Sequence, residues 1–188
     1  LLRRDSETTL AWIEQLPTGS LKANALRLTV DEWLGTDVEI DYARRASWLR
    51  SFAVQPSVGT EAIRRFAAGW VTDDYEAAWE WVENLEDGKV RNAAIQDMVR
   101  LWAGIDPHAA GEWINAQGSD PGMDPAVAAF ANLFSSTVPE IALGWAASLQ
   151  DDELREKTLN GIYRSWESRK PETARLWLND NRNHLVGE

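Results

Sequence analysis

Adjacent carboxylates are the side chains in this sequence that come closest to a catalytic pattern. Asp73 and Asp74 form one pair, and Asp151 and Asp152 form another. Two neighbouring carboxylates can divide the roles of general acid and general base, because each shifts the pKa of the other. Both pairs, however, stand where a helix is expected to begin, and an aspartate there accepts a hydrogen bond from a free backbone N–H. We therefore expect helix capping at both pairs.

A second group of acids forms a stripe along one predicted helix. Glu76, Glu80 and Glu83 share a helix face, and Glu86 and Asp87 follow them. Such a stripe could attract a cation, but acidic residues at helical spacing are more typical of a solvated surface. The surface interpretation is the one we adopt.

The sequence offers few candidate residues for metal binding, nucleophilic catalysis or phosphate binding. The chain contains no cysteine and two histidines, His108 and His184, neither of which has a partner at metal-ligand spacing. No serine stands in a nucleophile-elbow context. The glycines of segment 118–122 lie between predicted helices, so this segment is not a phosphate-binding loop. The sequence predicts no catalysis, no metal site and no cofactor.

The net charge limits the classes of partner. The 188 residues include 30 acidic and 19 basic side chains, which gives a formal charge of −11. Nucleic acids and anionic membrane surfaces both select for basic proteins, so we expect neither as a partner. The longest apolar run, residues 126–134, is interrupted by Asn132 and is far too short to cross a bilayer. We expect a soluble, acidic protein.

The elements that position all of these residues are marked by tryptophan. Of eleven tryptophans, ten fall into two series that recur about every 32 to 37 residues, and Phe134 takes the place of a tryptophan in the second series. Each member of the second series precedes a member of the first by the same interval, except Trp33, whose interval to Trp48 is longer and indicates a four-residue insertion near residues 35–40. We predict that these residues are the buried structural anchors of a repeat. The first series is Trp12, Trp48, Trp81, Trp113, Trp145 and Trp177, and the second is Trp33, Trp70, Trp102, Phe134 and Trp166.

Each repeat reads as two helices, named A and B here. Apolar residues recur at three-and-four spacing before every second-series aromatic, as between Ala94 and Trp102, which predicts an A helix. A B helix follows each A helix and carries the first-series tryptophan. After the longer, Pro- and Gly-containing connections, the A helices are expected to start late, near Thr60 and Asp124. The B helices are expected to start at an aspartate cap or at a first-turn proline: Asp5, Asp41, Asp74, Asp106, Pro107, Pro139 and Pro171.

A single pair of amphipathic helices cannot bury its apolar face alone, so the pairs must stack. The fold class we predict is all-α: an αα-superhelix, or solenoid, of about five helical hairpins plus an N-terminal unpaired helix, in one helical-repeat domain over residues 1–188. The first B helix lacks an A helix and the chain does not begin with methionine, which indicates a fragment of a longer chain. The repeat pattern ends at residues 179–182.

This pattern resembles the αα-hairpin solenoid superfamily, which includes the tetratricopeptide repeats. Tetratricopeptide repeats are about 34 residues long and end helix B with proline. Here the prevailing period is about 32 residues, proline opens helix B, and the dominant aromatic closes helix A. The resemblance thus implies an architecture, and it assigns no binding residue to a numbered position in this chain.

Four residues are candidates for contact with a partner. Trp79 is the tryptophan outside the two series, and it lies about 200° around its helix from the anchor Trp81. Leu10 and Leu143 occupy its position in other repeats, so burial between stacked repeats is the structural alternative. Basic residues gather in the A helices and acids in the B helices, and Arg64, Arg100 and Arg164 are the candidates to project from the A surface. Solubility and pairing along each helix are the alternative explanation.

These observations predict a non-catalytic scaffold that binds a protein or peptide through one face of the superhelix, with an acidic peptide as one candidate partner. The first alternative is a structural or self-associating spacer within a longer repeat array. The second alternative is an α/α-type hydrolase or lyase that uses carboxylates. The sequence assigns neither a compartment nor an oligomeric state.

Overall fold

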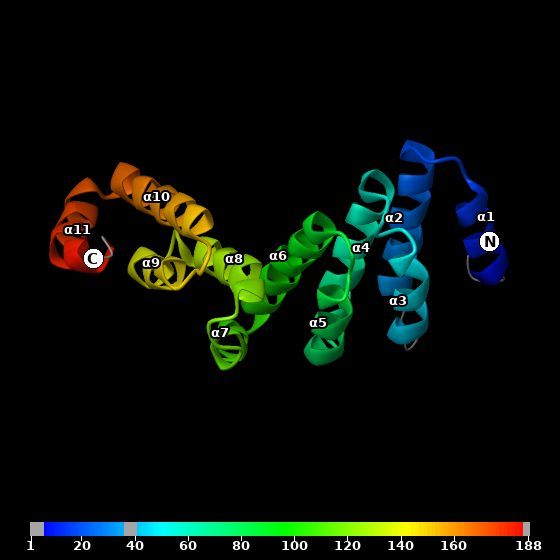
Figure 1. The fold of residues 1–188 in the computed structure, drawn as a ribbon, viewed down its shortest axis with the longest axis horizontal. Helices are drawn as coiled ribbons and strands as arrows, with labels where there is room; N and C mark the ends of the chain where they lie inside the picture. Colours follow the sequence, from blue (N-terminus) through cyan, green and yellow to red (C-terminus); the bar gives the residue numbers. More distant parts are fainter. Residues whose placement is uncertain (1–5, 36–40, 186–188) are drawn as a thin grey trace. The chain divides into compact units, whose positions relative to one another are not determined.

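The computed structural model describes residues 6–35 and 41–185, and within these residues it is helical with no strand (Figure 1). The chain is therefore all-α, as predicted. The helices predicted as type A are α2, α4, α6, α8 and α10, and those predicted as type B are α1, α3, α5, α7, α9 and α11. Their bounds are α1 Ser6–Gln15, α2 Ser20–Leu34, α3 Tyr42–Arg50, α4 Pro56–Trp70, α5 Tyr75–Glu83, α6 Gly88–Ile105, α7 Pro107–Ala116, η1 Pro121–Met123, α8 Asp124–Phe134, α9 Pro139–Ala147, α10 Asp152–Arg169 and α11 Pro171–Leu185.

The predicted starts of the B helices are confirmed wherever the structure describes them. The side chains of Asp41, Asp74 and Asp106 each accept a hydrogen bond from the backbone N–H three residues later, at 2.9 to 3.0 Å. Proline occupies the first position of α7, α9 and α11. The expected cap at Asp5 and the insertion at residues 36–40 lie outside the described residues.

The predicted start of the second A helix is wrong. Helix α4 begins at Pro56, four residues before Thr60, whereas α8 begins at Asp124 as expected. Proline suits the first helical turn, so the segment that reads as a connection becomes helix. Gly59 is required there for packing: a Cβ at this position would lie 2.8 Å from the Phe52 carbonyl carbon and closer still to its oxygen. Its role is therefore a close backbone approach and not a turn.

The chain divides into two compact units, residues 1–101 and 102–188, and the division falls within α6. In the first unit the A helices α2 and α4 lie side by side (Figure 1). Helix α4 also packs on α3 and α5, and α1 packs on α2. The single-domain organisation stays a prediction.

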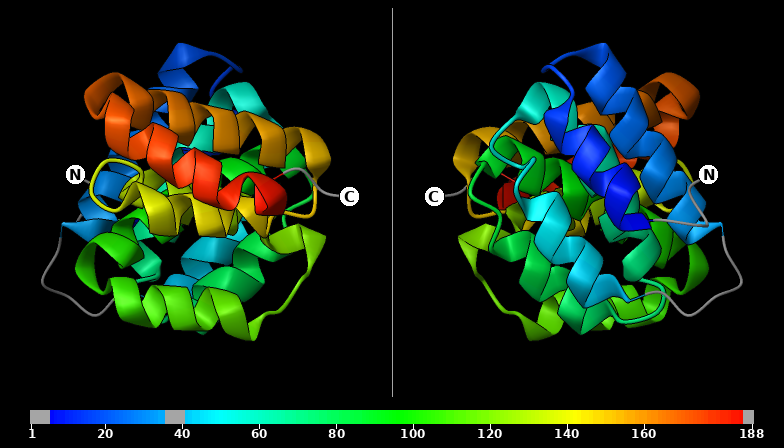
Figure 2. Two further views of the ribbon diagram at one scale, coloured as in Figure 1. Left: turned by 90° about the vertical axis from the view of Figure 1, so that its left-hand side faces the viewer. Right: turned by 90° about the vertical axis from the view of Figure 1, so that its right-hand side faces the viewer.

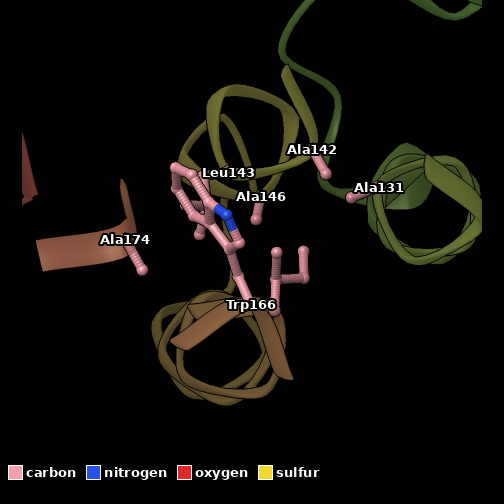
Figure 3. Packing of buried hydrophobic residues seen from close by; sticks show 7 residues of the cluster. Ala131, Ala142, Leu143, Ala146, Trp166 and Ala174 are labelled. Atoms are coloured by element: carbon pink, nitrogen blue, oxygen red, sulfur yellow. The ribbon is translucent and has the colours of Figure 1, made fainter. Parts of the chain in front are cut away.

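In the second unit α8 packs on α9, and α10 packs on α8, α9 and α11; Figure 2 shows α10 and α11 side by side. One core cluster of this unit combines the Trp166 ring with four alanines, a leucine and an isoleucine. The Trp166 indole extends from α10 toward Leu143 and Ala146 of α9, and Ala174 of α11 faces it (Figure 3). Alanine at these positions lets the helices approach closely enough to enclose the indole.

The two aromatic series meet in four of the predicted hairpins. The rings of Trp33 and Trp48 are 5.8 Å apart, and the pairs Trp70–Trp81, Trp102–Trp113 and Trp166–Trp177 are 5.6 to 6.1 Å apart. In the remaining hairpin Phe130 contacts both Phe134 and Trp145. In these four hairpins the paired members of the two series thus form a direct contact between an A helix and its B helix, whereas in the fifth the contact with Trp145 is made by Phe130, one helical turn before the series member Phe134.

Burial of the anchors is uneven. Trp33, Trp70, Trp81 and Trp166 are buried, and the remaining anchors apart from Trp12 are half-buried. Trp12 is 52% exposed, so the expectation that it lies in the core is wrong for this residue. Its A-helix counterpart, at the interval that holds in the other repeats, would be residue 1, which lies outside the described residues. No described A-helix ring therefore covers the Trp12 indole.

Candidate binding grooves

A groove of about 430 Å³ lies between the B helices α3 and α5. The anchor pair Trp70 and Trp81 lies at its base. The indole N–H of Trp81 donates to the Ala46 carbonyl at 3.2 Å, which joins the two helices below the groove. The remaining lining residues are Ala43, Ala46, Ser47 and Arg50 of α3 and Ala77, Glu80 and Asn84 of α5 or its C-terminal end.

A second groove, of about 360 Å³, lies between α1 and α3. It is again lined by an anchor pair, Trp33 and Trp48. Each lining residue from α1 has an equivalent in α3, one repeat later in the sequence, that lines the other groove. The repeat length used here is the interval from Trp12 to Trp48. The two grooves therefore occupy the same register in successive repeats. The lining residues are Glu7, Leu10, Ala11 and Glu14 on one side and Asp41, Arg44 and Arg45 on the other.

Side chains of the protein itself cross the α1–α3 groove. Arg44 of α3 forms an ion pair with Glu7 of α1. The Trp48 indole N–H donates to the Glu14 carboxylate at 2.6 Å, also from α3 to α1. The Arg45 guanidinium lies over the Trp33 ring, 4.9 Å from its centroid, in a cation–π contact. Intramolecular contacts thus bridge this groove from α3 to α1.

Burial changes the protonation equilibrium of Arg45. Desolvation lowers its pKa from the ordinary value, against the opposing effects of Asp41 and Tyr42. Its Nη1 is buried and has no hydrogen-bond partner within the described part of the chain. The Trp33 ring face is the compensating contact for this cation.

The α3–α5 groove lacks these internal contacts. At the position of Arg44 it has Ala77, and at the position of Glu7 it has Ala43. Neither the Arg50 guanidinium nor the Glu80 carboxylate has a hydrogen-bond or ion-pair partner among the described residues. Two opposite charges therefore line a groove whose other walls are short side chains.

The arginines predicted to project from the A surface differ in their surroundings. Arg64 forms ion pairs with Asp97 of α6 at 2.7 Å and with Glu61 at 3.4 Å. Arg100 also pairs with Asp97, at 3.0 Å, and its side chain is 61% exposed. Arg164 is exposed on α10. Acids within the A helices therefore engage Arg64 and Arg100, and binding of a partner by these three residues stays a prediction.

Three other basic residues of the A helices act as caps. Lys22 is buried and its Nζ donates to the Glu14 carbonyl at the end of α1, at 2.9 Å. Arg91 donates to the Leu85 carbonyl at 3.2 Å and Arg155 to the Leu149 carbonyl at 2.7 Å, each just after a B helix. A cation at the C-terminal end of a helix is favourable because the last carbonyls have no partner within the helix.

Trp79 is half-buried on α5, and it makes interactions with the protein. It stands two residues before its anchor, as do Ala46 and Leu143, which are both buried. Gly111, at the same position in α7, lies against Phe130 and Trp145: a Cβ there would come within 3.2 and 3.7 Å of these rings. The position therefore packs toward the next repeat in the units where contacts are described, and a partner contact at Trp79 stays a prediction.

The paired acids have structural contacts. Asp74 and Asp151 cap their helices, as expected from the sequence, with Asp151 accepting from the Leu154 N–H at 2.7 Å. Asp73 accepts a hydrogen bond from the Tyr42 hydroxyl, and Asp152 forms an ion pair with Arg155.

His108 is exposed and pairs with Glu112 along the same helix. Among the described residues, no group of three or more His, Cys, Asp or Glu is placed to hold a metal ion. None of the helices in the described part of the chain combines the length and apolar character needed to cross a bilayer.

Comparison of the chain with protein-family models, with curated proteins and with solved structures found no match. The likeness to αα-hairpin solenoids therefore stays a prediction from the residue pattern.

Proposed function

We propose that the chain is a non-catalytic scaffold that binds a peptide through grooves between consecutive B helices, and that its hairpins stack as an αα-superhelix. The observation that carries the proposal is the recurrence of a groove at one register, lined by an anchor tryptophan pair in both repeats. Aromatic rings in a concave site provide a large apolar contact area for a partner. This surface differs from the A surface favoured by the distribution of charge.

Selection from a displayed library of random linear peptides against the full chain tests the proposal. We expect a family of related sequences to be enriched, and a synthetic member to bind saturably with one-to-one stoichiometry in calorimetry. A folded, helical sample that enriches no related sequences would contradict it. Peptides that are acidic and are lost on the triple substitution R64E/R100E/R164E would instead favour the A surface.

A self-associating spacer is the second candidate function, and Trp12 is the observation that favours it. Its indole is 52% exposed, whereas the first-series tryptophans of α3, α5, α7 and α11 lie 5.6 to 6.1 Å from an A-helix ring. A helix from a second copy would cover the exposed ring. Sedimentation velocity over a range of concentrations tests this candidate: wild type is expected to associate and Trp12→Ser to stay monomeric.

A further inference from the structure

We propose that the α3–α5 groove binds a peptide by one uncharged apolar side chain together with the adjacent main-chain amide group. The inference rests on the proposed function and deepens it by stating the chemistry of the partner. It also selects one of the two grooves, because their lining side chains differ although the grooves occupy the same register of the repeat.

The first step is the availability of the groove. In the α1–α3 groove a partner would have to displace the Glu7–Arg44 ion pair and the hydrogen bond from Trp48 to Glu14. In the α3–α5 groove the Trp81 indole donates to a backbone carbonyl below the groove. A ligand that enters there displaces no ion pair between α3 and α5 among the described residues, so the cost of binding is lower.

The second step concerns the apolar part of the groove. The lining residues from the first turns of α3 and α5 are Ala43 and Ala77, and the rings of Trp70 and Trp81 lie beneath them. Arg44 fills the position of Ala77 in the preceding repeat, so the short alanine leaves space that a partner's side chain can occupy. An aliphatic or aromatic side chain gains the most there, because burial of its surface on indole and methyl groups costs no hydrogen bond.

The third step concerns the two charges. Arg50 and Glu80 line the same groove with opposite sign, and neither has a partner among the described residues. A charged side chain of a partner would meet one like charge along with one opposite charge. A peptide group presents one acceptor and one donor, so its carbonyl suits the guanidinium and its N–H suits the carboxylate. The groove therefore matches a neutral segment, in contrast to an acidic or a basic one.

The experiment uses the full chain and peptides enriched from the displayed random library. Affinities of one synthetic peptide are compared between wild type, Ala77→Arg and Ala147→Arg. Ala77→Arg places in this groove the side chain that Arg44 supplies in the other, and Ala147→Arg is the control because Ala147 is exposed on the B helix α9 and lines neither groove. We expect Ala77→Arg to weaken binding about tenfold or more and Ala147→Arg to leave it unchanged.

A double variant, R50A/E80A, provides an independent comparison at two exposed positions, in case Ala77→Arg lowers the thermal stability. The double variant is expected to weaken binding of the same peptide about tenfold, while its circular dichroism spectrum stays that of wild type. Enriched peptides should share an uncharged aliphatic or aromatic residue.

Two results would overturn the inference and leave the proposed function intact: a uniformly acidic or basic consensus, or full affinity for both Ala77→Arg and R50A/E80A. The absence of any enriched family would count against both proposals.

Discussion

Arg64 and Asp97 form an ion pair at 2.7 Å although they belong to different repeats of the sequence. The pair joins α4 to α6 within the first unit. Arg65 makes the corresponding link from α4 back to Asp31 of α2, at 3.0 Å. Successive A helices of this unit are thus connected by arginines that read, in the sequence alone, as a surface for an acidic partner.

Reversal of the charge at Arg64 is expected to destabilise the first unit. Arg64→Glu would place a carboxylate beside Asp97 and Glu61, which are its present partners. Because the Arg64 side chain is 35% exposed and solvent screens the pair, we expect a loss of only about 1 kcal/mol in the free energy of unfolding. Urea denaturation measures it, and added salt should reduce the difference from wild type.

The matched control is Arg100→Glu, since Arg100 contacts the same Asp97 from a side chain that is 61% exposed. We expect its effect to be a few tenths of a kcal/mol. If the two charge reversals lower the free energy of unfolding equally, the ion pair between α4 and α6 adds no stability beyond the effect of a local change in charge.

Gly59→Ala is expected to lower the free energy of unfolding by about 2 kcal/mol. The added methyl group would lie 2.8 Å from the Phe52 carbonyl carbon, so α4 must move away from the chain at residues 51–54. Thermal denaturation followed by circular dichroism gives the comparison. Gly161→Ala in α10 is the control, because nothing lies within 4 Å of its added Cβ, and it should stabilise its helix by about 0.5–1 kcal/mol. A stabilising effect of Gly59→Ala would contradict the observed contact.

Gly59 also shows where prediction from the sequence ends. The tryptophan spacing and the aspartate caps specify the helix order and the ring contact inside four of the hairpins, because both depend on residues close in the sequence. They do not predict the start of α4, because the segment from Gln55 to Gly59 has the composition of a connection. Its helical turn packs directly on the Phe52 backbone, and a pattern of residue types does not record such a contact.

The grooves are not predicted from the sequence, for a related reason. Ala43 and Ala77 read as ordinary helix-forming residues, and their small size matters only once α3 and α5 lie next to each other. A signal is nevertheless present: comparison of equivalent positions shows Arg44 replaced by Ala77. The assignment of basic residues to an A surface leaves out the acids on the same helices, such as Asp31 and Asp97, with which they pair.

Asp124 is expected to be essential for the connection between α9 and α10. It is 5% exposed, and its carboxylate accepts hydrogen bonds from the Gln150 and Asp151 N–H groups at 2.9 and 2.7 Å. Asp124→Ala leaves both donors without an acceptor, which should lower the free energy of unfolding by about 2–3 kcal/mol. Asp120→Ala is the matched control: its exposed carboxylate accepts from the Gly122 N–H, and its loss should cost under about 1 kcal/mol in denaturant titration. Similar costs for the two substitutions would argue against a special role for Asp124.

Tyr42 is expected to make stability depend on pH in the alkaline range. Its ring stacks on Trp70 at 5.2 Å, and its hydroxyl donates to Asp73 at 2.7 Å. Burial, and secondly the hydrogen bond to Asp73, raise the pKa of Tyr42 above its ordinary value. The folded state therefore holds the phenolic proton at a pH where the unfolded chain, with a tyrosine pKa of about 10, releases it.

The sign of the effect follows from this difference. The stabilisation by Tyr42 is complete below about pH 10 and declines as the pH rises from there toward the higher pKa of the folded state. Tyr42→Phe should lower the free energy of unfolding by about 1 kcal/mol at neutral pH, because the hydrogen bond to Asp73 is absent. This difference in stability from wild type, the gap between the two proteins, should narrow above about pH 10. Urea denaturation of both proteins across this range measures the gap. A gap that stays constant would mean that the proton on Tyr42 is held no more tightly in the folded chain than in the unfolded one.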